Sequence, residues 1–301
     1  MKDIQFKRTE LEDREMMHEY FRQFPSRSCE RTFANSLLWS RHYPVTFAEI
    51  EHTLVFRSLS RGGEAYTYPV GQSENVKKAL DFLKQYTKER ELPFVLYHIT
   101  EEQFAQLNEW YPNQLEIEYD RDIADYIYES EKLATLSGKK LHAKRNHINK
   151  FKATYDNWSY ETMSEDNLEE CFQMALKWRN DNECDENHEK NAEMCVTLNA
   201  LRLFKELELT GGVLKINGEV VAFTIGEPIN EDTFVVHIEK AFADIQGAYP
   251  MINQQFIEHE CMQHKYINRE EDTGAEGLRK AKLSYRPAFL VEKGVVKEKI
   301  Q

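Results

Sequence analysis

Apolar residues recur every three or four positions in several segments of the chain, and this spacing predicts amphipathic helices. One begins at Ser73, a good N-cap residue, and Thr100-Glu-Glu-Gln103 forms a capping box before another. Helices are predicted for residues 73–86, 139–152, 164–178, 192–207 and 250–264, and another follows the capping box with Phe104 and Leu107 as its first apolar positions.

Other segments alternate polar and apolar side chains or are rich in β-branched and aromatic residues, which predicts strands. Arg61-Gly62-Gly63 is predicted to turn between two early strands, and Asn217-Gly218 is a strong hairpin signal. Strands are predicted for residues 47–59, 65–70, 93–97, 114–120, 124–128, 211–216, 219–225, 233–240, 266–268 and 288–296. Similar orders of helices and strands occur twice, which predicts a duplicated, mixed α/β (α+β) architecture.

The length and composition favour two domains with real hydrophobic cores, since the chain has 301 residues of which 41% are hydrophobic. No apolar run approaches the roughly 18–20 residues of a spanning helix, and the five cysteines form no Cys-x-x-Cys pair. We therefore expect a cytoplasmic protein without a disulfide framework. Cys184 and His188 offer metal ligands, but an acidic solvated loop explains them as well, so no metal is expected.

The net charge of −13 is unevenly distributed. Residues 132–155 contain seven Lys or Arg and no Asp or Glu, so the rest of the chain carries −13 − 7 = −20. Unrelieved positive charge on a helix is mildly destabilising, which favours an anionic ligand that relieves it, and Lys and Arg both suit phosphate. The alternative is a solvated helix. The candidate ligand-binding residues of this basic helix are Lys144, Arg145, Asn146 and Lys150.

A second candidate region, residues 268–287, changes from acidic to basic around two glycines. Asp272 is suited to hold an amine or take its proton, and Lys282 and Arg279 are suited to neutralise an anion; Tyr285 follows them. The alternative is that these charges pair with one another on the protein surface, where ion pairs contribute little to stability.

A third candidate region is the loop before the helix predicted at Pro250, where Gln246 and Gly247 precede a helix N-terminus, a natural site for an anion. His237 and Glu239 alternate on the preceding strand, so they share a face and are candidates for a base, or are simply half-exposed. No Walker phosphate loop and no Gly-x-Gly-x-x-Gly occurs.

Two long motifs carry a family resemblance. Lys139-Lys-Leu-His-Ala-Lys-Arg-Asn-His-Ile-Asn-Lys-Phe151 and Glu271-Asp-Thr-Gly-Ala-Glu-Gly-Leu-Arg-Lys-Ala-Lys-Leu-Ser-Tyr-Arg-Pro-Ala-Phe289 resemble the bacterial family related to the C-terminal domain of phosphatidylglycerol lysyltransferase. The resemblance implies two tandem acyltransferase-like (GNAT) domains, similar to Fem-like aminoacyl transferases. It also implies that Arg279 and Lys282 lie near the acceptor or the tRNA terminus, and that Asp272 lies in the pocket.

The resulting hypothesis is an acyl or aminoacyl transferase with an N-terminal GNAT-like domain (1–135), a basic connecting helix (136–156) and a C-terminal GNAT-like domain (157–301) carrying the site. Asp272, Lys282 and Glu239 are the candidate catalytic residues.

We expect no tightly bound cofactor; acyl-CoA or aminoacyl-tRNA is the candidate donor. A tRNA acceptor end is a possible partner, with no duplex DNA and at most peripheral membrane contact. The alternatives are a non-catalytic module that binds a nucleotide or phosphorylated ligand, and a pure interaction protein.

Overall fold

A computed structural model describes residues 4–60, 63–184 and 188–299. Two sequence predictions fall partly on other residues: the turn at Arg61-Gly62-Gly63 and the loop between Cys184 and His188 lie largely outside the described residues. None of the described helices is both long and apolar enough to cross a membrane.

The chain forms two compact units that do not follow the predicted domain boundaries. Unit 1 contains Met1–Asp125, Glu271–Ala275 and Val291–Gln301, and unit 2 contains Tyr126–Glu270 and Glu276–Leu290. The basic helix therefore belongs to unit 2, and the last strand of the chain lies mostly in unit 1, where it pairs with a strand near residue 97. Local patterns do not reveal this exchange, because strand pairing joins residues that are far apart in sequence.

Unit 1 is a sheet with the strand order β1-β2-β3-β4-β11-β5. Its strands are β1 (Val45–Ile50), β2 (Thr53–Ser60), β3 (Gly63–Tyr66), β4 (Val95–Thr100), β11 (Phe289–Glu298) and the first part of β5 (Leu115–Glu129). Its helices are η1 (Leu11–Asp13), α1 (Arg14–Gln23), α2 (Phe33–Trp39), α3 (Ser73–Glu89) and α4 (Glu101–Trp110). The capping box predicted at Thr100 is present. The single strand predicted at residues 47–59 is wrong, because Glu51 and His52 take positive φ and make a hairpin turn.

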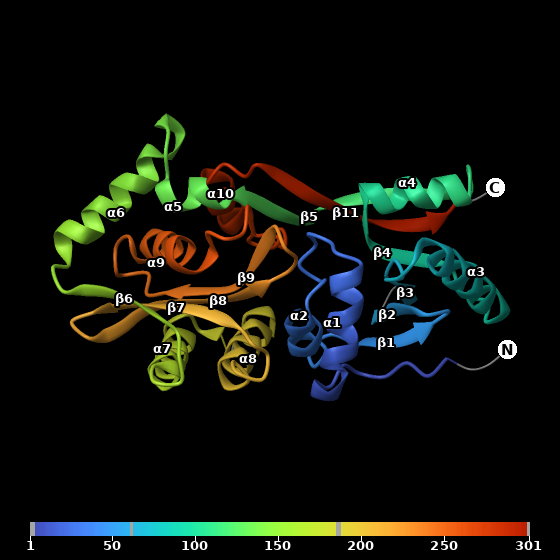
Figure 1. Cartoon of the computed structure of the whole chain (residues 1–301), viewed down its shortest axis with the longest axis horizontal. Helices are drawn as coiled ribbons and strands as arrows, with labels where there is room; N and C mark the ends of the chain where they lie inside the picture. The colour runs from blue at the N-terminus through green and yellow to red at the C-terminus, as the bar shows by residue number, and fades with distance from the viewer. Residues whose placement is uncertain (1–3, 61–62, 185–187, 300–301) are drawn as a thin grey trace. The chain divides into compact units, whose positions relative to one another are not determined.

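Unit 2 is a sheet with the strand order β5-β10-β9-β8-β7-β6. Its strands are the second part of β5, β6 (Trp158–Thr162), β7 (Thr210–Ile216), β8 (Glu219–Pro228), β9 (Thr233–Ala241) and β10 (Tyr266–Asn268). Its helices are α5 (Ser130–Thr135), η2 (Lys139–Leu141), α6 (His142–Thr154), α7 (Leu168–Asp181), α8 (His188–Arg202), α9 (Ala248–Phe256), η4 (Ile257–Cys261) and α10 (Glu276–Ser284). Helix α9 covers one face of β7 and β8, and α7 packs on the opposite face (Figure 1). The Asn217-Gly218 hairpin is confirmed.

The same supersecondary motif occurs in both units. In unit 1, β3 and β4 are parallel and α3 connects them; in unit 2, β9 and β10 are parallel and α9 connects them. In each case the second strand of the parallel pair also pairs with an antiparallel strand, β11 or β5. A separate hydrophobic core lies in each unit. The predicted duplication is therefore present, and the fold class is the predicted mixed α/β one.

Candidate active site

The candidate site lies in unit 2, where the two parallel strands part. Their ladder ends at the pair Val235 and Asn268, although β9 continues to Ala241. The chain beyond β10 then forms a bulge, because Arg269 donates its N–H to the Tyr126 carbonyl and Tyr126 donates its own to the Glu270 carbonyl. Ligands of open α/β sheets bind beyond the carboxyl ends of parallel strands, so this is the expected position for a site.

Glu239 is the centre of this site. Its Oε1 accepts a hydrogen bond from Arg269 Nη2 at 2.9 Å, and its Oε2 accepts one from Asn253 Nδ2 at 3.0 Å. The pair is largely buried, with 12% of the Glu239 side chain and 13% of the Arg269 side chain exposed. Burial alone would lower the pKa of Arg269, but the Glu239 carboxylate and two tyrosines raise it, so the guanidinium stays charged.

Two polar atoms beside Glu239 have no hydrogen-bond partner among the described residues. They are the donor Arg269 Nη1 and the acceptor Asn253 Oδ1, and both are buried. An unsatisfied buried polar group costs about 1–3 kcal/mol, so native structures rarely keep one without a use. A donor and an acceptor on either side of a carboxylate are suited to a ligand that carries both an oxygen and an N–H group.

The basic helix α6 contributes Lys144 to the same site. Its Nζ lies 4.0 Å from the centre of the Tyr285 ring, and the Arg269 guanidinium lies 4.9 Å from that ring. Burial, and then Arg269, lower the pKa of Lys144, whereas Glu239 opposes this shift. Lys144 of the basic helix and Tyr285 of the C-terminal motif, which are far apart in sequence, thus lie close together. We call Lys144, Glu239, Asn253, Arg269 and Tyr285 the β9–β10 site.

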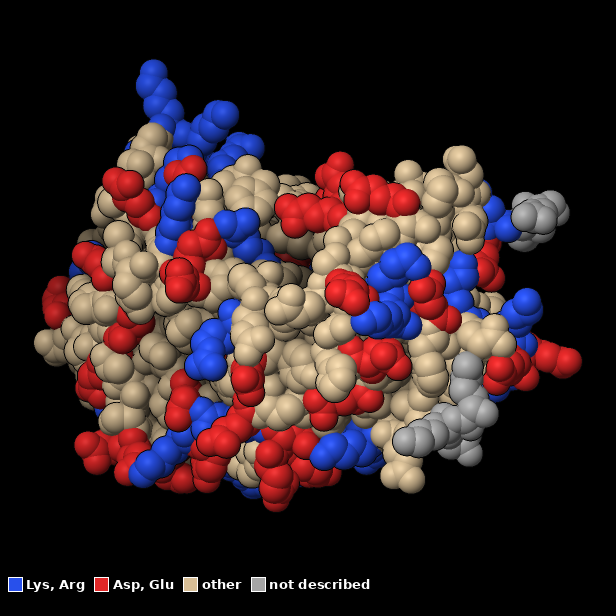
Figure 2. Space-filling view, turned by 45° about the vertical axis from the view of Figure 1, so that its right-hand side comes forward, with Lys and Arg blue, Asp and Glu red and all other residues tan. Residues whose placement is uncertain are grey.

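The other predicted residues of α6 lie elsewhere. Arg145 donates through Nη1 to the carbonyl oxygens of Leu136 and Gly138, so it fixes the loop before the helix. Asn146 is exposed and contacts His142, and Lys150 is exposed. Figure 2 shows Lys and Arg side chains gathered over the start of this helix, where Lys139 and Lys140 are exposed. Phosphate binding by Arg145, Asn146 and Lys150 remains a prediction.

The predicted residues of the C-terminal motif are divided between the units. Lys282 donates its ammonium hydrogens to the carbonyl oxygens of Arg269 and Glu270, so it holds the bulge in place. Asp272 belongs to unit 1, where it is fully buried, pairs with Arg121 at 3.5 Å and accepts the N–H of Gly274. Arg279 lies on α10, partly exposed. Catalytic roles for Asp272 and Lys282 remain predictions.

His237 is not available as a neutral base, because both of its ring nitrogens contact carboxylates. Nδ1 lies 2.7 Å from Glu270 Oε1 and Nε2 lies 3.0 Å from Glu227 Oε1. Burial alone would lower the pKa of His237, but hydrogen bonds to Glu227 and Glu270 raise it to about 10. The imidazolium is therefore the form present at neutral pH.

This shift predicts a pH-dependent effect of His237→Gln. A raised folded-state pKa gives stability that is fully present below about pH 6.5 and is lost as the pH rises toward about 10. We expect the variant to be less stable than the wild type at pH 6.5 and the difference to shrink steadily up to pH 10, measured by urea unfolding. The exposed His147→Gln is the control. A difference that grows with pH would contradict the assignment.

The predicted anion loop at Gln246 and Gly247 is closely packed. Gly247 has φ +88° and a Cβ added to it would lie 2.7 Å from the His147 carbonyl oxygen of α6. Ala248 already donates its N–H to Ile245, and Pro250 in the first turn of α9 has no N–H to offer. Phosphate binding at this loop remains a prediction.

Gly247→Ala tests this packing. We expect a loss of about 3 kcal/mol, since the contact with His147 adds to the strain of a left-handed backbone. Gly218→Ala is the matched control, because Gly218 has φ +83° and nothing within 4 Å of an added Cβ, so only about 1 kcal/mol is expected. Equal losses of unfolding free energy in the two variants, measured by urea unfolding, would show that α6 moves away from the added methyl group without an energetic cost.

Sequence reasoning missed a buried ionic cluster in unit 1. Lys293 Nζ lies 2.8 Å from Asp125 Oδ1 and 2.7 Å from Glu30 Oε1, and it is fully buried. Ligand atoms of Cys29, Asp125 and Glu271 lie within 4.8 Å of one another, a spacing that suits a metal ion. The Lys293 ammonium already supplies the cation at this position, so the cluster needs no metal to balance it.

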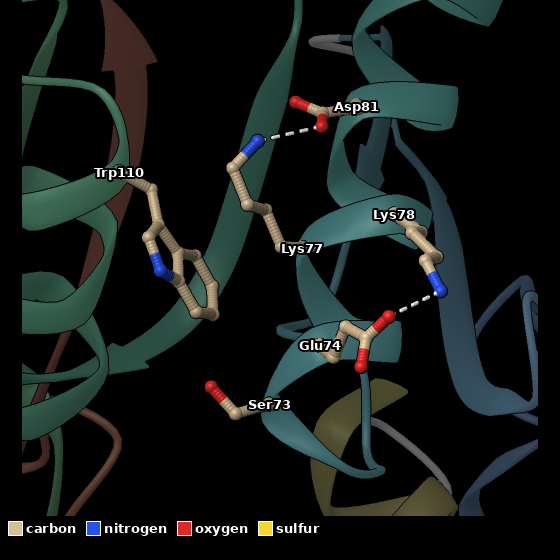
Figure 3. Close-up of a pocket in the computed structure, with 6 residues that line it drawn as sticks. All are labelled: Ser73, Glu74, Lys77, Lys78, Asp81 and Trp110. Carbon is tan, nitrogen blue, oxygen red and sulfur yellow. Dashed lines mark hydrogen bonds and ion pairs between the residues drawn. The ribbon is translucent and has the colours of Figure 1, made fainter.

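Unit 1 also has an open groove of about 530 Å³ between α3 and α4. Figure 3 shows the Trp110 indole facing Lys77 and Ser73 across it. Lys77 pairs with Asp81 and Lys78 pairs with Glu74, each at 2.7 Å, so its charges are balanced. None of the predicted site residues lines this groove.

The two units, each with a parallel strand pair joined by a helix, have the fold of tandem GNAT-like acyltransferases. Residues 21–296 match the family described as phosphatidylglycerol lysyltransferase, C-terminal. The chain belongs to this family, which confirms the resemblance seen in the sequence. The family and the fold place the chain among proteins of the acyltransferase kind.

Three solved structures are similar along nearly the whole chain. A conserved protein of unknown function from Bacteroides thetaiotaomicron is 40% identical with a TM-score of 0.92, covering 99% of this chain and 100% of that one. The C-terminal domain of a putative lysylphosphatidylglycerol synthetase from Agrobacterium fabrum has a TM-score of 0.67 at 13% identity, covering 95% and 91%. L-PGS from Bacillus licheniformis has a TM-score of 0.66 at 14% identity, covering 100% and 95%.

One curated relative matches part of the chain. It is an uncharacterized protein of Mycoplasmoides gallisepticum, 24% identical over 193 residues, which are 63% of this chain. The match spans 61% of that relative's length.

Proposed function

We propose that the chain transfers an aminoacyl group from aminoacyl-tRNA to an amine or hydroxyl acceptor at the β9–β10 site. One observation carries this proposal: a buried donor, Arg269 Nη1, and a buried acceptor, Asn253 Oδ1, lack partners on either side of Glu239. An aminoacyl ester has a carbonyl oxygen that matches the donor and an α-ammonium group that matches the acceptor. A simple acyl thioester has no such ammonium group.

The roles follow from this arrangement. The acceptor attacks the acyl carbonyl carbon, and Glu239 orients the attacking group and receives its proton. Arg269, assisted by Lys144, stabilises the oxyanion of the tetrahedral intermediate. The bond to the tRNA ribose oxygen then breaks, and that oxygen takes up the proton. No covalent enzyme intermediate is required. Exposed cations at the start of α6 are suited to tRNA phosphates, and the close packing at Gly247 argues against acyl-CoA.

A transfer assay tests the proposal. Radiolabelled aminoacyl-tRNA and acetyl-CoA are offered as donors, with phosphatidylglycerol vesicles and a lysine-containing peptide as acceptors. We expect product from aminoacyl-tRNA, greatly reduced in Lys144→Met and retained in Lys152→Met, which removes an exposed cation from the end of the same helix. Product from acetyl-CoA alone would identify a different donor. Saturable tRNA binding without product would favour the non-catalytic binding module.

A further inference from the structure

Unit 1 repeats the backbone arrangement that forms the β9–β10 site. Its parallel pair ends at Tyr66 and Leu96, and β4 then bulges, because Tyr97 and His98 together face the single residue Val295 of β11. His98 has φ 55°, and Glu270, the second bulge residue of unit 2, has φ 57°. A bulge turns side chains toward a new direction and is common beside functional sites.

This backbone conformation is costly for His98. A left-handed conformation costs a residue with a Cβ about 1–2 kcal/mol, and His98 adopts it within a strand. Its ring is held in place, because Nδ1 lies 3.0 Å from Glu30 Oε1. Strain of this kind is concentrated at ligand sites.

Arg31, next to Glu30 in the sequence, is a cation whose charge is only partly neutralised by the groups around it. Its Nη1 is buried without a hydrogen-bond partner, and no hydrogen bond joins its guanidinium to any described residue. Burial lowers the pKa of Arg31 to about 10, with Glu30 and Tyr68 opposing the shift. Glu30 Oε1 lies 2.7 Å from Lys293 Nζ and 3.0 Å from His98 Nδ1. The Glu30 carboxylate is therefore shared with these two groups and does not neutralise Arg31 alone.

Two phenols complete the surroundings of this segment. Burial raises the pKa of Tyr68 and of Tyr97, so both hydroxyls stay protonated at neutral pH. Tyr68 opposes the lowering of the Arg31 pKa, and Glu30 adds to the raised pKa of Tyr97. The other carboxylates of the buried cluster, Asp125 and Glu271, raise the pKa of Lys293. They are not among the groups that shift the pKa of Arg31.

We propose that unit 1 carries a second ligand site, centred on Arg31 beside the His98 bulge, which binds a small oxyanion, either a carboxylate or a phosphate. The anion accepts hydrogen bonds from the guanidinium N–H groups that have no partner. Its negative charge also offsets the positive charge of Arg31, which burial places in a low-dielectric surrounding. Arg31 as a residue is partly exposed, although its Nη1 is buried. At the position of Arg269, the group assigned to the oxyanion, unit 1 has Tyr97, so this is a site for binding rather than acyl transfer.

Thermal unfolding with added anions tests the site. Inorganic phosphate and acetate are titrated separately against potassium chloride of equal ionic strength, and the arm that responds identifies the class of anion. A ligand that binds the native state raises the melting temperature as its concentration exceeds Kd. We expect one anion to raise the melting temperature of the wild type and of Arg41→Gln, whose arginine is exposed, but not that of Arg31→Gln.

Two further variants complete the test. Arg269→Gln is expected to keep the full shift, which separates this site from the β9–β10 site. Arg31→Lys retains the charge without the forked donors, so a smaller shift is expected, and it replaces Arg31→Gln if that variant does not fold. A full shift in Arg31→Gln or Arg31→Lys, a shift that Arg269→Gln abolishes, or no response of the wild type beyond chloride would overturn the proposal.

Discussion

Replacing Lys293 with methionine is expected to destabilise the protein by about 3–5 kcal/mol, because it leaves the buried Asp125 carboxylate and the partly exposed Glu30 carboxylate without their cation. Lys293 is fully buried and contacts Asp125 and Glu30. Burial alone would lower the pKa of Lys293, but Asp125, Cys29 and Glu30 raise it well above its usual value, so the native protein contains the ammonium form. Urea unfolding at pH 7 measures the loss.

Two comparisons distinguish charge from packing. Lys297→Met removes an exposed lysine from the same strand and is expected to change stability by less than about 0.5 kcal/mol. In Lys293→Met the unpaired carboxylates acquire raised pKa values, so the variant should recover part of its lost stability as the pH falls from 7 to 5. A loss of unfolding free energy that is both below about 1 kcal/mol and independent of pH would show that another group balances the charge of these carboxylates.

Local sequence patterns predicted most elements because these elements depend on neighbouring residues. The Thr100 capping box and the Asn217-Gly218 hairpin are interactions over three or four residues, and both are present. The turn at Glu51 and His52 was missed because neither residue is typical of a tight turn and apolar residues continue on both sides. The buried role of Lys293 depends on Asp125 and Glu30, residues far away in the sequence that no local spacing connects.

The candidate site was predictable in part for the same reason. The lack of carboxylates identified the basic helix, but charge alone does not tell which cation faces inward, and of two adjacent residues Lys144 joins the site while Arg145 binds backbone carbonyls. Arg269 directly follows a buried strand, and Asn253 is a polar residue on the buried side of α9. Both were signals in the sequence, but their pairing with Glu239 required the fold.

Glu239→Gln is expected to lower kcat/KM for aminoacyl transfer by about 10²–10⁴-fold, because the amide cannot take a proton from the attacking group. The amide oxygen still accepts a hydrogen bond from Arg269, so the change removes charge more than shape. If Glu239 acts on the attacking group, the loss lies in kcat; if it mainly binds the aminoacyl group, KM rises instead. Steady-state kinetics with aminoacyl-tRNA separates the two.

The matched control is Glu219→Gln, which removes an exposed carboxylate from β8 and should leave both constants unchanged. Folding of Glu239→Gln is checked by its urea midpoint, since a buried Arg269 without its counterion destabilises the unit. A folded Glu239→Gln with less than about a tenfold loss would assign Glu239 to holding Arg269 and Asn253 in place. Proton transfer would then pass directly from the acceptor to the departing ribose oxygen or through solvent, and Arg269 would remain the group that stabilises the oxyanion.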